Sequence, residues 1–149
     1  MTTVARYVID TSGVIRAFPD FFEVDERLSA ATRKIIDDAL MPYSHTRLSI
    51  PSIVFVEIFE KWLKTEEKAR AFYYSVFQPF VESPNVEIKP LEREVLDNLF
   101  LIRGSLAGHD LHDKLVLASA MMLKAALITT DHKIQKYVEE SHVIPQTLS

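Results

Sequence analysis

Two kinds of hydrophobic pattern alternate along the chain. Short β-branched and aromatic runs, of which residues 4–9 are the first, end at polar residues, as is typical of strands. Longer segments carry apolar residues near a period of 3.6, as is typical of amphipathic helices. In residues 23–41, for example, Leu28 and Ile35 fall on one helical face. The sequence therefore predicts a regular exchange of strands and helices.

The pattern gives the approximate bounds of each expected element. Strands are expected over residues 4–9, 48–50, 86–89, 126–129 and 143–144. Helices are expected through residues 14–15, stopping near Pro19, then over residues 23–41, 51–64, 66–80, 91–103 and 113–124, with a last helix beginning at Asp131. Because long helices connect short strands, the order predicts an α/β fold with three layers (α/β/α) and a central, mainly parallel sheet.

The composition fits one domain over residues 1–149. The hydrophobic share is 48%, which is enough for one core and too high for a disordered chain. No repeat, linker or low-complexity stretch divides the sequence. The glycine patterns of dinucleotide-binding folds and of P-loops are both absent, which excludes the usual nucleotide-binding motifs.

Charge and cysteine content narrow the function classes further. The 21 acidic residues outnumber the 17 basic ones, and this net charge of −4 argues against nucleic-acid binding by bulk electrostatics. The chain has no cysteine, so it can form no disulfide and no thiolate metal site. No apolar stretch reaches the length of a signal peptide or a membrane helix. Together these features predict a soluble, cytoplasmic protein without membrane contact.

Four acidic residues stand where a parallel sheet forms its sites. Such sites lie outside the carboxyl ends of the strands, and Asp10 and Asp131 each follow a predicted strand. Asp113 begins the helix before the second of these strands. That helix carries the chain roughly 18 Å away from the edge, and the turn and strand that follow return it by roughly 13 Å or more. Asp113 and Asp131 are therefore expected at the same edge of the sheet as Asp10. Glu57 lies in an almost wholly apolar helix, where a carboxylate is costly unless it is paired or bound to a cation.

Each acid taken alone also suits an ordinary structural role. Asp10 and Asp131 are good caps for the helices that follow them. Asp113 and the nearby Asp110 are favoured by a helix dipole, and Glu57 can pair with a lysine one turn on. Converging carboxylates, however, repel one another and take up protons unless a counter-charge is present. A divalent cation supplies that charge, and oxygen ligands suit Mg²⁺ or Mn²⁺.

Four segments of the chain carry a family likeness in their order and spacing. They are Tyr7-Val-Ile-Asp-Thr-Ser12, Pro51-Ser-Ile-Val-Phe-Val-Glu-Ile58, His112-Asp-Lys-Leu-Val-Leu-Ala-Ser-Ala120 and Leu127-Ile-Thr-Thr-Asp131. On these segments the chain resembles the PIN domain (PilT N-terminus) family of metal-dependent nucleases, and within it the small VapC-type toxin ribonucleases. The resemblance implies a PIN-like three-layer α/β/α fold. It further implies site residues, which are an acidic quartet of Asp10, Glu57, Asp113 and Asp131, an additional acid at Asp110, and supporting hydroxyls at Thr11 and Ser12 or at Thr129 and Thr130.

The resemblance also implies an activity and partners. Asp10, Asp113 and Asp131 would bind one or two Mg²⁺ or Mn²⁺ ions, and Glu57 would bind through water or orient the attacking water. The protein would be a metal-dependent endoribonuclease acting on RNA. It would also be the toxin of a type II toxin–antitoxin pair, a homodimer with a cognate antitoxin. The alternatives are a non-toxin PIN nuclease in RNA processing and a non-catalytic PIN-like module that binds RNA or protein.

Two further sets of residues have both a structural and a functional interpretation. The basic residues Arg16, Lys61, Lys114 and Lys133 can contact phosphates near the site or be ordinary surface charges. An aromatic helix can complete the core or present a dimer or antitoxin surface, and its residues are Phe72, Tyr73, Tyr74, Phe77 and Phe80.

Overall fold

The computed structural model describes residues 4–149 and contains one five-stranded sheet within them. Its strands are β1 (Ala5–Ile9), β2 (Thr46–Pro51), β3 (Val86–Lys89), β4 (Ala126–Ile128) and β5 (Thr147–Leu148). They lie in the order β3-β2-β1-β4-β5, and every pairing between neighbours is parallel. The expected central, mainly parallel sheet is therefore confirmed.

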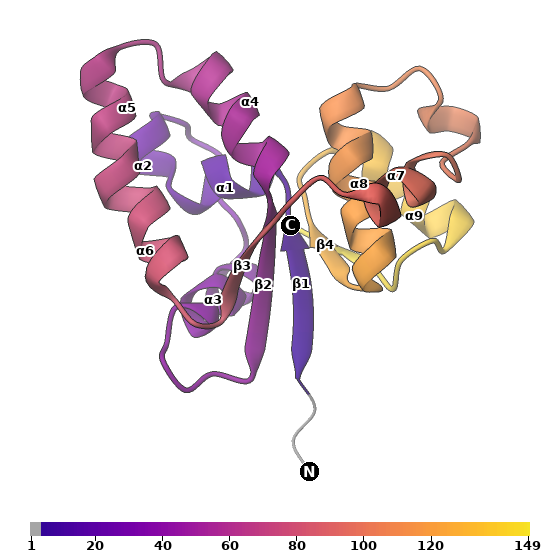
Figure 1. The fold of residues 1–149 in the computed structure, drawn as a ribbon, viewed down its shortest axis with the longest axis horizontal. Helices are drawn as coiled ribbons and strands as arrows, with labels where there is room; N and C mark the ends of the chain where they lie inside the picture. The colour runs from indigo at the N-terminus through magenta and orange to yellow at the C-terminus, as the bar shows by residue number, and fades with distance from the viewer. Residues whose placement is uncertain (1–3) are drawn as a thin grey trace.

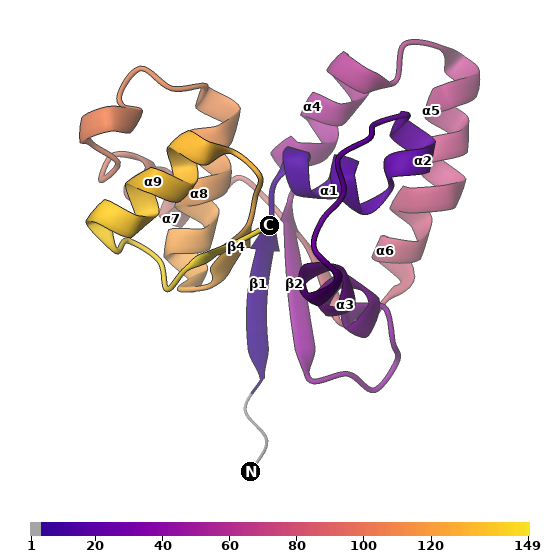
Figure 2. The ribbon, with the colours of Figure 1, turned by 180° about the vertical axis from the view of Figure 1, so that it is seen from behind.

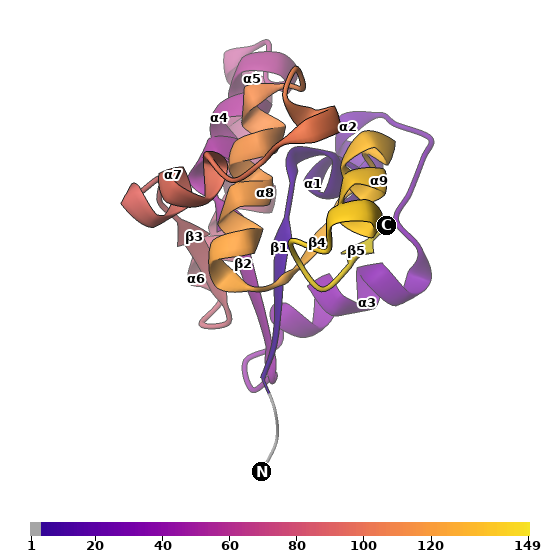
Figure 3. The same cartoon turned by 90° about the vertical axis from the view of Figure 1, so that its right-hand side faces the viewer.

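Helices cover both faces of this sheet (Figure 1). One layer holds α1 (Thr11–Ala17), α2 (Pro19–Phe22), α3 (Ala30–Ala39), α4 (Ser52–Trp62), α5 (Glu66–Phe72), the π-helical turn η1 (Tyr73–Phe77) and α6 (Gln78–Glu82). The other holds α7 (Arg93–Leu99), the 3₁₀ turn η2 (Gly104–Leu106), α8 (Leu111–Leu123) and α9 (His132–Ser141). Figure 2 shows the same division from behind, and in Figure 3 α7, α8 and α9 stand in front of the sheet. The three-layer α/β/α architecture is confirmed.

The strand order places a reversal of direction at β1. From β1 the chain steps outward to β2 and β3, and it then returns across the sheet to β4 on the other side of β1. In open parallel sheets such a reversal opens a crevice outside the carboxyl ends of the two central strands. The segments that follow β1 and β4 therefore meet at one place, which is where Asp10 and Asp131 lie.

The core explains why the two central strands, β1 and β4, end in apolar residues. Val8, Ile9, Leu127 and Ile128 of the two central strands are all fully buried, because helices cover the sheet on both faces. Gly13 lets α1 pack closely on these strands. A Cβ at this position would lie 2.6 Å from Ile9 Cγ1 and 3.1 Å from the Ile128 carbonyl oxygen. The first turn of α1 is thus held against the ends of β1 and β4.

Two of the helices predicted before β3 differ from the structure. The helix expected over residues 23–41 is only α3, because Glu23 adopts a left-handed conformation and Ser29 caps a new start at Ala30. The helix expected through residues 14–15 is α1, which ends at Ala17, near Pro19 as predicted. Pro19 itself begins the short helix α2, since proline is tolerated in the first turn. The helix expected over residues 66–80 contains the π turn η1. Pro79 follows this turn and has no N–H to continue an α-helical ladder.

The end of the chain also departs from the prediction. The strand expected over residues 143–144 is wrong, and the last strand is β5. His142 ends α9 in a left-handed conformation, and Ile144 then turns into the core, where it is buried. Only two residues of β5 pair with β4, which is too short a run to leave an alternating pattern in the sequence. Likewise, the helix expected over residues 91–103 is the shorter α7, followed by η2.

Among the helices of residues 4–149, none combines the length and apolar character that a membrane crossing requires.

Candidate active site

Asp10 is the most deeply buried acid at the carboxyl end of the sheet, with 1% of its surface exposed. Its Oδ1 accepts hydrogen bonds from the Ser12 hydroxyl at 2.6 Å and from the Gly13 N–H at 2.8 Å, so the side chain caps α1. Burial raises the pKa of Asp10 from 3.8 to about 6, although hydrogen bonds from Ser12, Thr129 and Gly13 act in the opposite direction. A charge at this position is therefore costly without a cation.

Hydroxyl groups tie the segment after β1 to the segment after β4. The Ser12 hydroxyl accepts a hydrogen bond from the Thr130 N–H at 2.9 Å, and the Thr129 hydroxyl accepts one from the Asp131 N–H at 3.1 Å. Asp131 in turn caps α9, because its Oδ1 accepts from the N–H groups of Lys133 and Ile134 at 2.9 and 3.1 Å. These bonds fix Asp10 and Asp131 relative to each other through the backbone.

Glu57 enters the site from α4 and is 7% exposed. Its Oε2 lies 3.6 Å from the Lys61 ammonium, the pairing that helical spacing predicts. The same oxygen lies 3.3 Å from Nδ1 of His112, at the start of α8. Glu57 therefore bridges the helix layers on the two sides of the sheet.

Asp113 faces these groups from the first turn of α8. Its pKa is raised from 3.8 to about 6, first by burial and then by the negative charges of other acids. Those acids are Asp10, Asp131, Asp110 and Glu57. This mutual repulsion is what the sequence leads one to expect of converging carboxylates.

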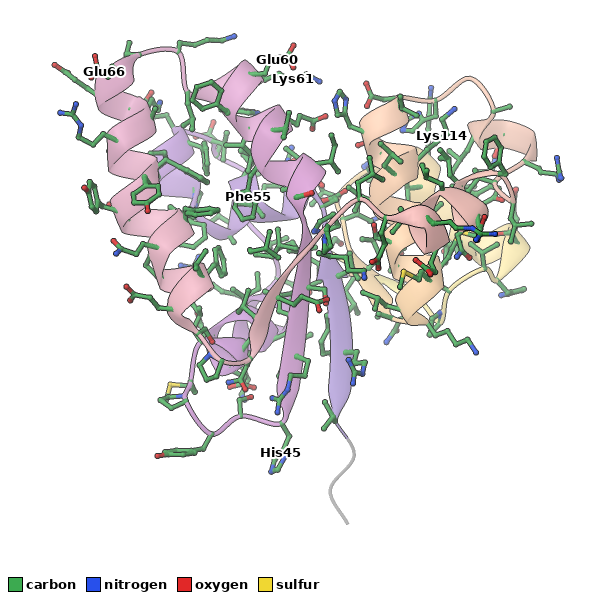
Figure 4. The ribbon with its side chains drawn as sticks, viewed as in Figure 1. His45, Phe55, Glu60, Lys61, Glu66 and Lys114 are labelled. Atoms are coloured by element: carbon green, nitrogen blue, oxygen red, sulfur yellow. The ribbon has the colours of Figure 1, made fainter. Side chains whose placement is uncertain are left out.

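One open cavity of about 280 Å³ collects the four acids. Its lining consists of Asp10, Thr11, Ser12, Ile15, Arg16, Glu57, Lys61, Trp62, Asp113 and Asp131. Of the four basic residues considered from the sequence, Arg16 and Lys61 belong to this lining, and Lys114 and Lys133 do not. Figure 4 shows Lys61 on α4 and Lys114 on α8, the helices of opposite layers; the Lys114 ammonium donates to the Ala107 carbonyl at 3.1 Å.

Asp110 stands apart from the cavity lining. Its Oδ1 accepts from the N–H groups of His112 and Asp113 at 2.8 and 3.4 Å, and thus caps α8. Slight burial acts to raise the pKa of Asp110, but these hydrogen bonds and the positive charges of His112 and Lys61 lower it overall. The structure groups Asp110 with Glu57 and His112, not with Asp113 and Asp131.

His109 is a residue of the site that the sequence reasoning missed. Its Nε2 lies 3.1 Å from Oδ2 of Asp113 and 3.1 Å from Oδ2 of Asp131. The spacing of four residues between His109 and Asp113 was the available signal, but it lies across the boundary between a loop and a helix. The contact with Asp131, 22 residues further on, depends on the fold alone.

The donor atoms present fit a divalent cation. Carboxylate oxygens of Asp10, Asp113 and Asp131 converge from three segments, and repulsion and burial already disfavour the charged forms of two of them. The structure contains two groups of three potential ligand residues, and within each group the ligand atoms lie within 4.8 Å of one another. One group is Glu57, Asp110 and His112, and the other is His109, Asp113 and Asp131. A bound cation would neutralise charges that the folded chain otherwise holds at a cost.

Comparison with known proteins places this site in context. The model of the PIN domain family matches residues 7–140. Among solved structures, the chain is similar to VapBC2 from Rickettsia felis bound to a DNA fragment from its promoter, with a TM-score of 0.65 and 16% identity over 95% of this chain and 96% of that one. It is also similar to FitAcB from Neisseria gonorrhoeae, with a TM-score of 0.62 and 15% identity over 96% of each chain.

A third similar structure is that of the PIN domain endonuclease Utp24, with a TM-score of 0.50 and 14% identity over 97% of this chain and 85% of that one. No curated protein sequence matches the chain. At these identities the structural likeness concerns the fold.

Proposed function

Because the chain belongs to the PIN domain family, we propose that it is a metal-dependent endoribonuclease that hydrolyses RNA at the cavity of four acids. The observation that carries this proposal is the convergence of Asp10, Glu57, Asp113 and Asp131, from four separate segments, on one cavity at the reversal of the sheet. A purely structural role for each acid does not account for their meeting, since two of them are held charged only at a cost.

The four acids have two different proposed roles, metal binding and orientation of the attacking water. Asp10, Asp113 and Asp131 would hold one or two Mg²⁺ or Mn²⁺ ions. A divalent cation, when bound, supplies positive charge against the attacked phosphate and acidifies a water molecule. Glu57 orients the attacking water and is itself positioned by Lys61 and His112.

Basic side chains supply contacts to the RNA backbone. Arg16 and Lys61 line the cavity and can contact phosphates on either side of the cleaved bond. An ion pair to Glu26, with 3.1 Å between Arg16 Nε and Glu26 Oε2, holds Arg16 in place. The net negative charge of the chain thus does not prevent RNA binding, because bound cations reverse the sign of the site toward phosphate.

We further propose that the protein is the toxin of a type II toxin–antitoxin pair, a homodimer that acts in the cytoplasm and binds a cognate antitoxin. The likeness to VapBC2 and FitAcB supports this proposal. So do the aromatic side chains of the helical layer. Phe72 and Phe80 belong to the core, but Phe59, Tyr73 and Tyr74 are 63%, 49% and 62% exposed, respectively, which suits contact with a protein partner.

The nuclease proposal is tested by RNA cleavage with the purified protein, with Mg²⁺ or Mn²⁺ and after chelation. We expect cleavage only with the cation, and a loss of at least ~100-fold in Asp10→Asn. Asp20→Asn is the matched control, because this aspartate is 92% exposed and is not part of the cavity lining; the variant should cleave at the wild-type rate. The same assay with a single-stranded DNA of the same sequence tests whether the protein cleaves RNA in preference to DNA.

Cleavage by Asp10→Asn at the wild-type rate would contradict the assignment of the site. RNA binding without cleavage under all ionic conditions would favour the non-catalytic module instead.

The toxin proposal has its own test. Induced expression of the wild type in a bacterial host should arrest growth, whereas Asp10→Asn should not, and co-expression of a small protein encoded next to this gene should restore growth. Light scattering should give twice the monomer mass if the protein is a homodimer. A protein that cleaves RNA in vitro but leaves growth unchanged would instead be a non-toxin nuclease of RNA processing.

A further inference from the structure

His109 lies between two carboxylates of the cavity. We infer that His109 is a nitrogen ligand of the bound cation, together with Asp113 and Asp131, and that the site therefore favours a first-row transition ion such as Mn²⁺ over Mg²⁺. This inference rests on the proposed function, because it concerns the ion of the same site. It goes beyond an acidic site by naming a nitrogen ligand and the class of metal that such a ligand selects.

The distances fit three neighbouring ligands of one ion. His109 Nε2 lies 3.1 Å from Oδ2 of Asp113 and 3.1 Å from Oδ2 of Asp131, and all three atoms lie within 4.8 Å of one another. Bonds of about 2.1 Å to an octahedral ion place adjacent ligand atoms about 3 Å apart. The three side chains thus already have the mutual spacing that an ion would require of them.

The loop that carries His109 is anchored on several sides. Leu106, in η2, is fully buried, and its carbonyl accepts a hydrogen bond from the His109 N–H at 3.0 Å. The Arg103 N–H donates to the Tyr137 hydroxyl at 3.2 Å, and Lys114 donates to the Ala107 carbonyl at 3.1 Å. The loop backbone at His109 is therefore fixed before any ion binds, and the His109 side chain is only 14% exposed.

The two carboxylate oxygens of Asp131 have different partners. Oδ1 accepts hydrogen bonds from the N–H groups of Lys133 and Ile134 and caps α9, while Oδ2 faces His109. An ion at Oδ2 would leave the helix cap intact.

The second group of potential ligands is less suited to an ion. Glu57 already has the Lys61 ammonium 3.6 Å from Oε2, so part of the charge that an ion would supply is present. Asp110 uses Oδ1 to cap α8, and its side chain is 45% exposed. We therefore assign the nitrogen ligand to His109 and not to His112.

The choice of metal follows from the chemistry of the ligand. Mg²⁺ prefers oxygen ligands in a near-ideal octahedron and gives up its waters reluctantly. Imidazole nitrogen suits first-row transition ions better, and Mn²⁺ is the member of that series that also accepts carboxylates readily. One histidine with carboxylates is thus a mixed site in which Mn²⁺ gains more from His109 than Mg²⁺ does.

The test measures Mn²⁺ binding to the full chain in the absence of RNA. Pulsed electron paramagnetic resonance detects directly bound ¹⁴N on Mn²⁺, and calorimetry gives the Kd for Mn²⁺ and for Mg²⁺. We expect ¹⁴N coupling in the wild type and its loss in His109→Gln, with Mn²⁺ affinity reduced about tenfold or more and Mg²⁺ affinity reduced less. His112→Gln is the matched control and should keep the ¹⁴N coupling.

A second variant separates ligation from a merely structural contact. His109→Asp replaces the nitrogen by oxygen and should shift the preference toward Mg²⁺, whereas a role in hydrogen bonding alone predicts no such shift. Mn²⁺ that binds without ¹⁴N coupling, or coupling that survives in His109→Gln, would overturn the inference while leaving a metal nuclease. Absence of any Mn²⁺ or Mg²⁺ binding, with cleavage in chelator, would overturn the proposed function itself.

Discussion

The acids at the strand ends and the acids on the helices are held in different ways. Asp10 and Asp131 follow β1 and β4, and each accepts backbone N–H groups that begin the next helix. Glu57 and Asp113 project from α4 and α8, and their partners are side chains, namely Lys61 and His112 for the first and His109 for the second. The backbone therefore fixes the strand-end pair, and the packing of two helix layers fixes the other pair.

This difference separates structural from chemical roles. A carboxylate that caps a helix can be replaced by asparagine without loss of the cap, because the amide oxygen accepts the same hydrogen bonds. A helix-borne carboxylate caps nothing, so its removal relieves repulsion without loss of a backbone contact. The four acids thus meet at one cavity but should respond differently to substitution.

The largest expected effect is on activity, in Asp113→Asn. The substitution removes a proposed ligand from the centre of the cluster, and we expect the cleavage rate at saturating Mn²⁺ to fall by roughly 1,000-fold, which corresponds to about 4 kcal/mol. Initial rates on a labelled RNA measure this, with Asp97→Asn on α7 as the control, since its side chain is 65% exposed. A fall of less than about tenfold would mean that Asp113 does not bind the ion.

Asp131 should show both roles of a strand-end acid. Asp131→Ala removes the cap of α9 as well as a ligand, and we expect it to lower the free energy of unfolding by about 1 kcal/mol. Asp131→Asn should keep the stability and lose only activity. Urea unfolding of the ion-free proteins compares the two variants. Equal stability of both would show that the cap contributes nothing and would remove the distinction between the two pairs of acids.

The pH dependence of the free energy of unfolding tests whether the charged form of the buried Asp10 carboxylate destabilises the fold. Burial raises the pKa of folded Asp10 from 3.8 to about 6, so the folded chain holds this proton more tightly than the unfolded chain. The resulting stabilisation is complete below the unfolded pKa and is lost as the pH rises through 6. We therefore expect the ion-free protein to be about 1 kcal/mol more stable at pH 5 than at pH 7 from Asp10 alone.

Salt distinguishes Asp10 from Asp113 in the same experiment. Asp10→Asn should remove its share of the pH dependence at any ionic strength, because desolvation is the main cause of its pKa shift. Asp113 adds a share of the same sign. Burial is its main cause as well, but the charges of four acids add to it, and salt screens only this added part. A pH dependence that stays unchanged in Asp10→Asn would contradict the charge cost assigned to this residue.

The sequence predicted most of the sheet and the convergence of four acids, for identifiable reasons. The two central strands end in short apolar runs, at Val8 and Ile9 in β1 and at Leu127 and Ile128 in β4, because both faces of the sheet are covered there. Asp10 and Asp131 interrupt the ends of two such runs, and Glu57 interrupts an apolar helix, so all three stand out. The confirmed family membership adds the order of these segments, which no single segment provides.

What escaped prediction depends on contacts between distant residues. His109 meets Asp131 because η2 packs beside α9, and no local pattern records that packing. The π turn η1 reflects a single proline within an otherwise helical pattern. Asp110 entered the predicted site only through the family resemblance, as an additional acid near Asp113; in the structure it is the N-cap of α8 and lies just outside the helix.

Asp110→Asn should therefore have the smallest effect on activity. The asparagine keeps the hydrogen bonds to the N–H groups of His112 and Asp113, so α8 should begin at the same residue. Only a half-exposed charge outside the cavity lining is lost, and we expect about a threefold change in cleavage rate, further reduced by salt. The assay used for Asp113→Asn measures both variants side by side. A loss as large as that of Asp113→Asn would place Asp110 on the ion and would make Glu57, Asp110 and His112 a second metal site.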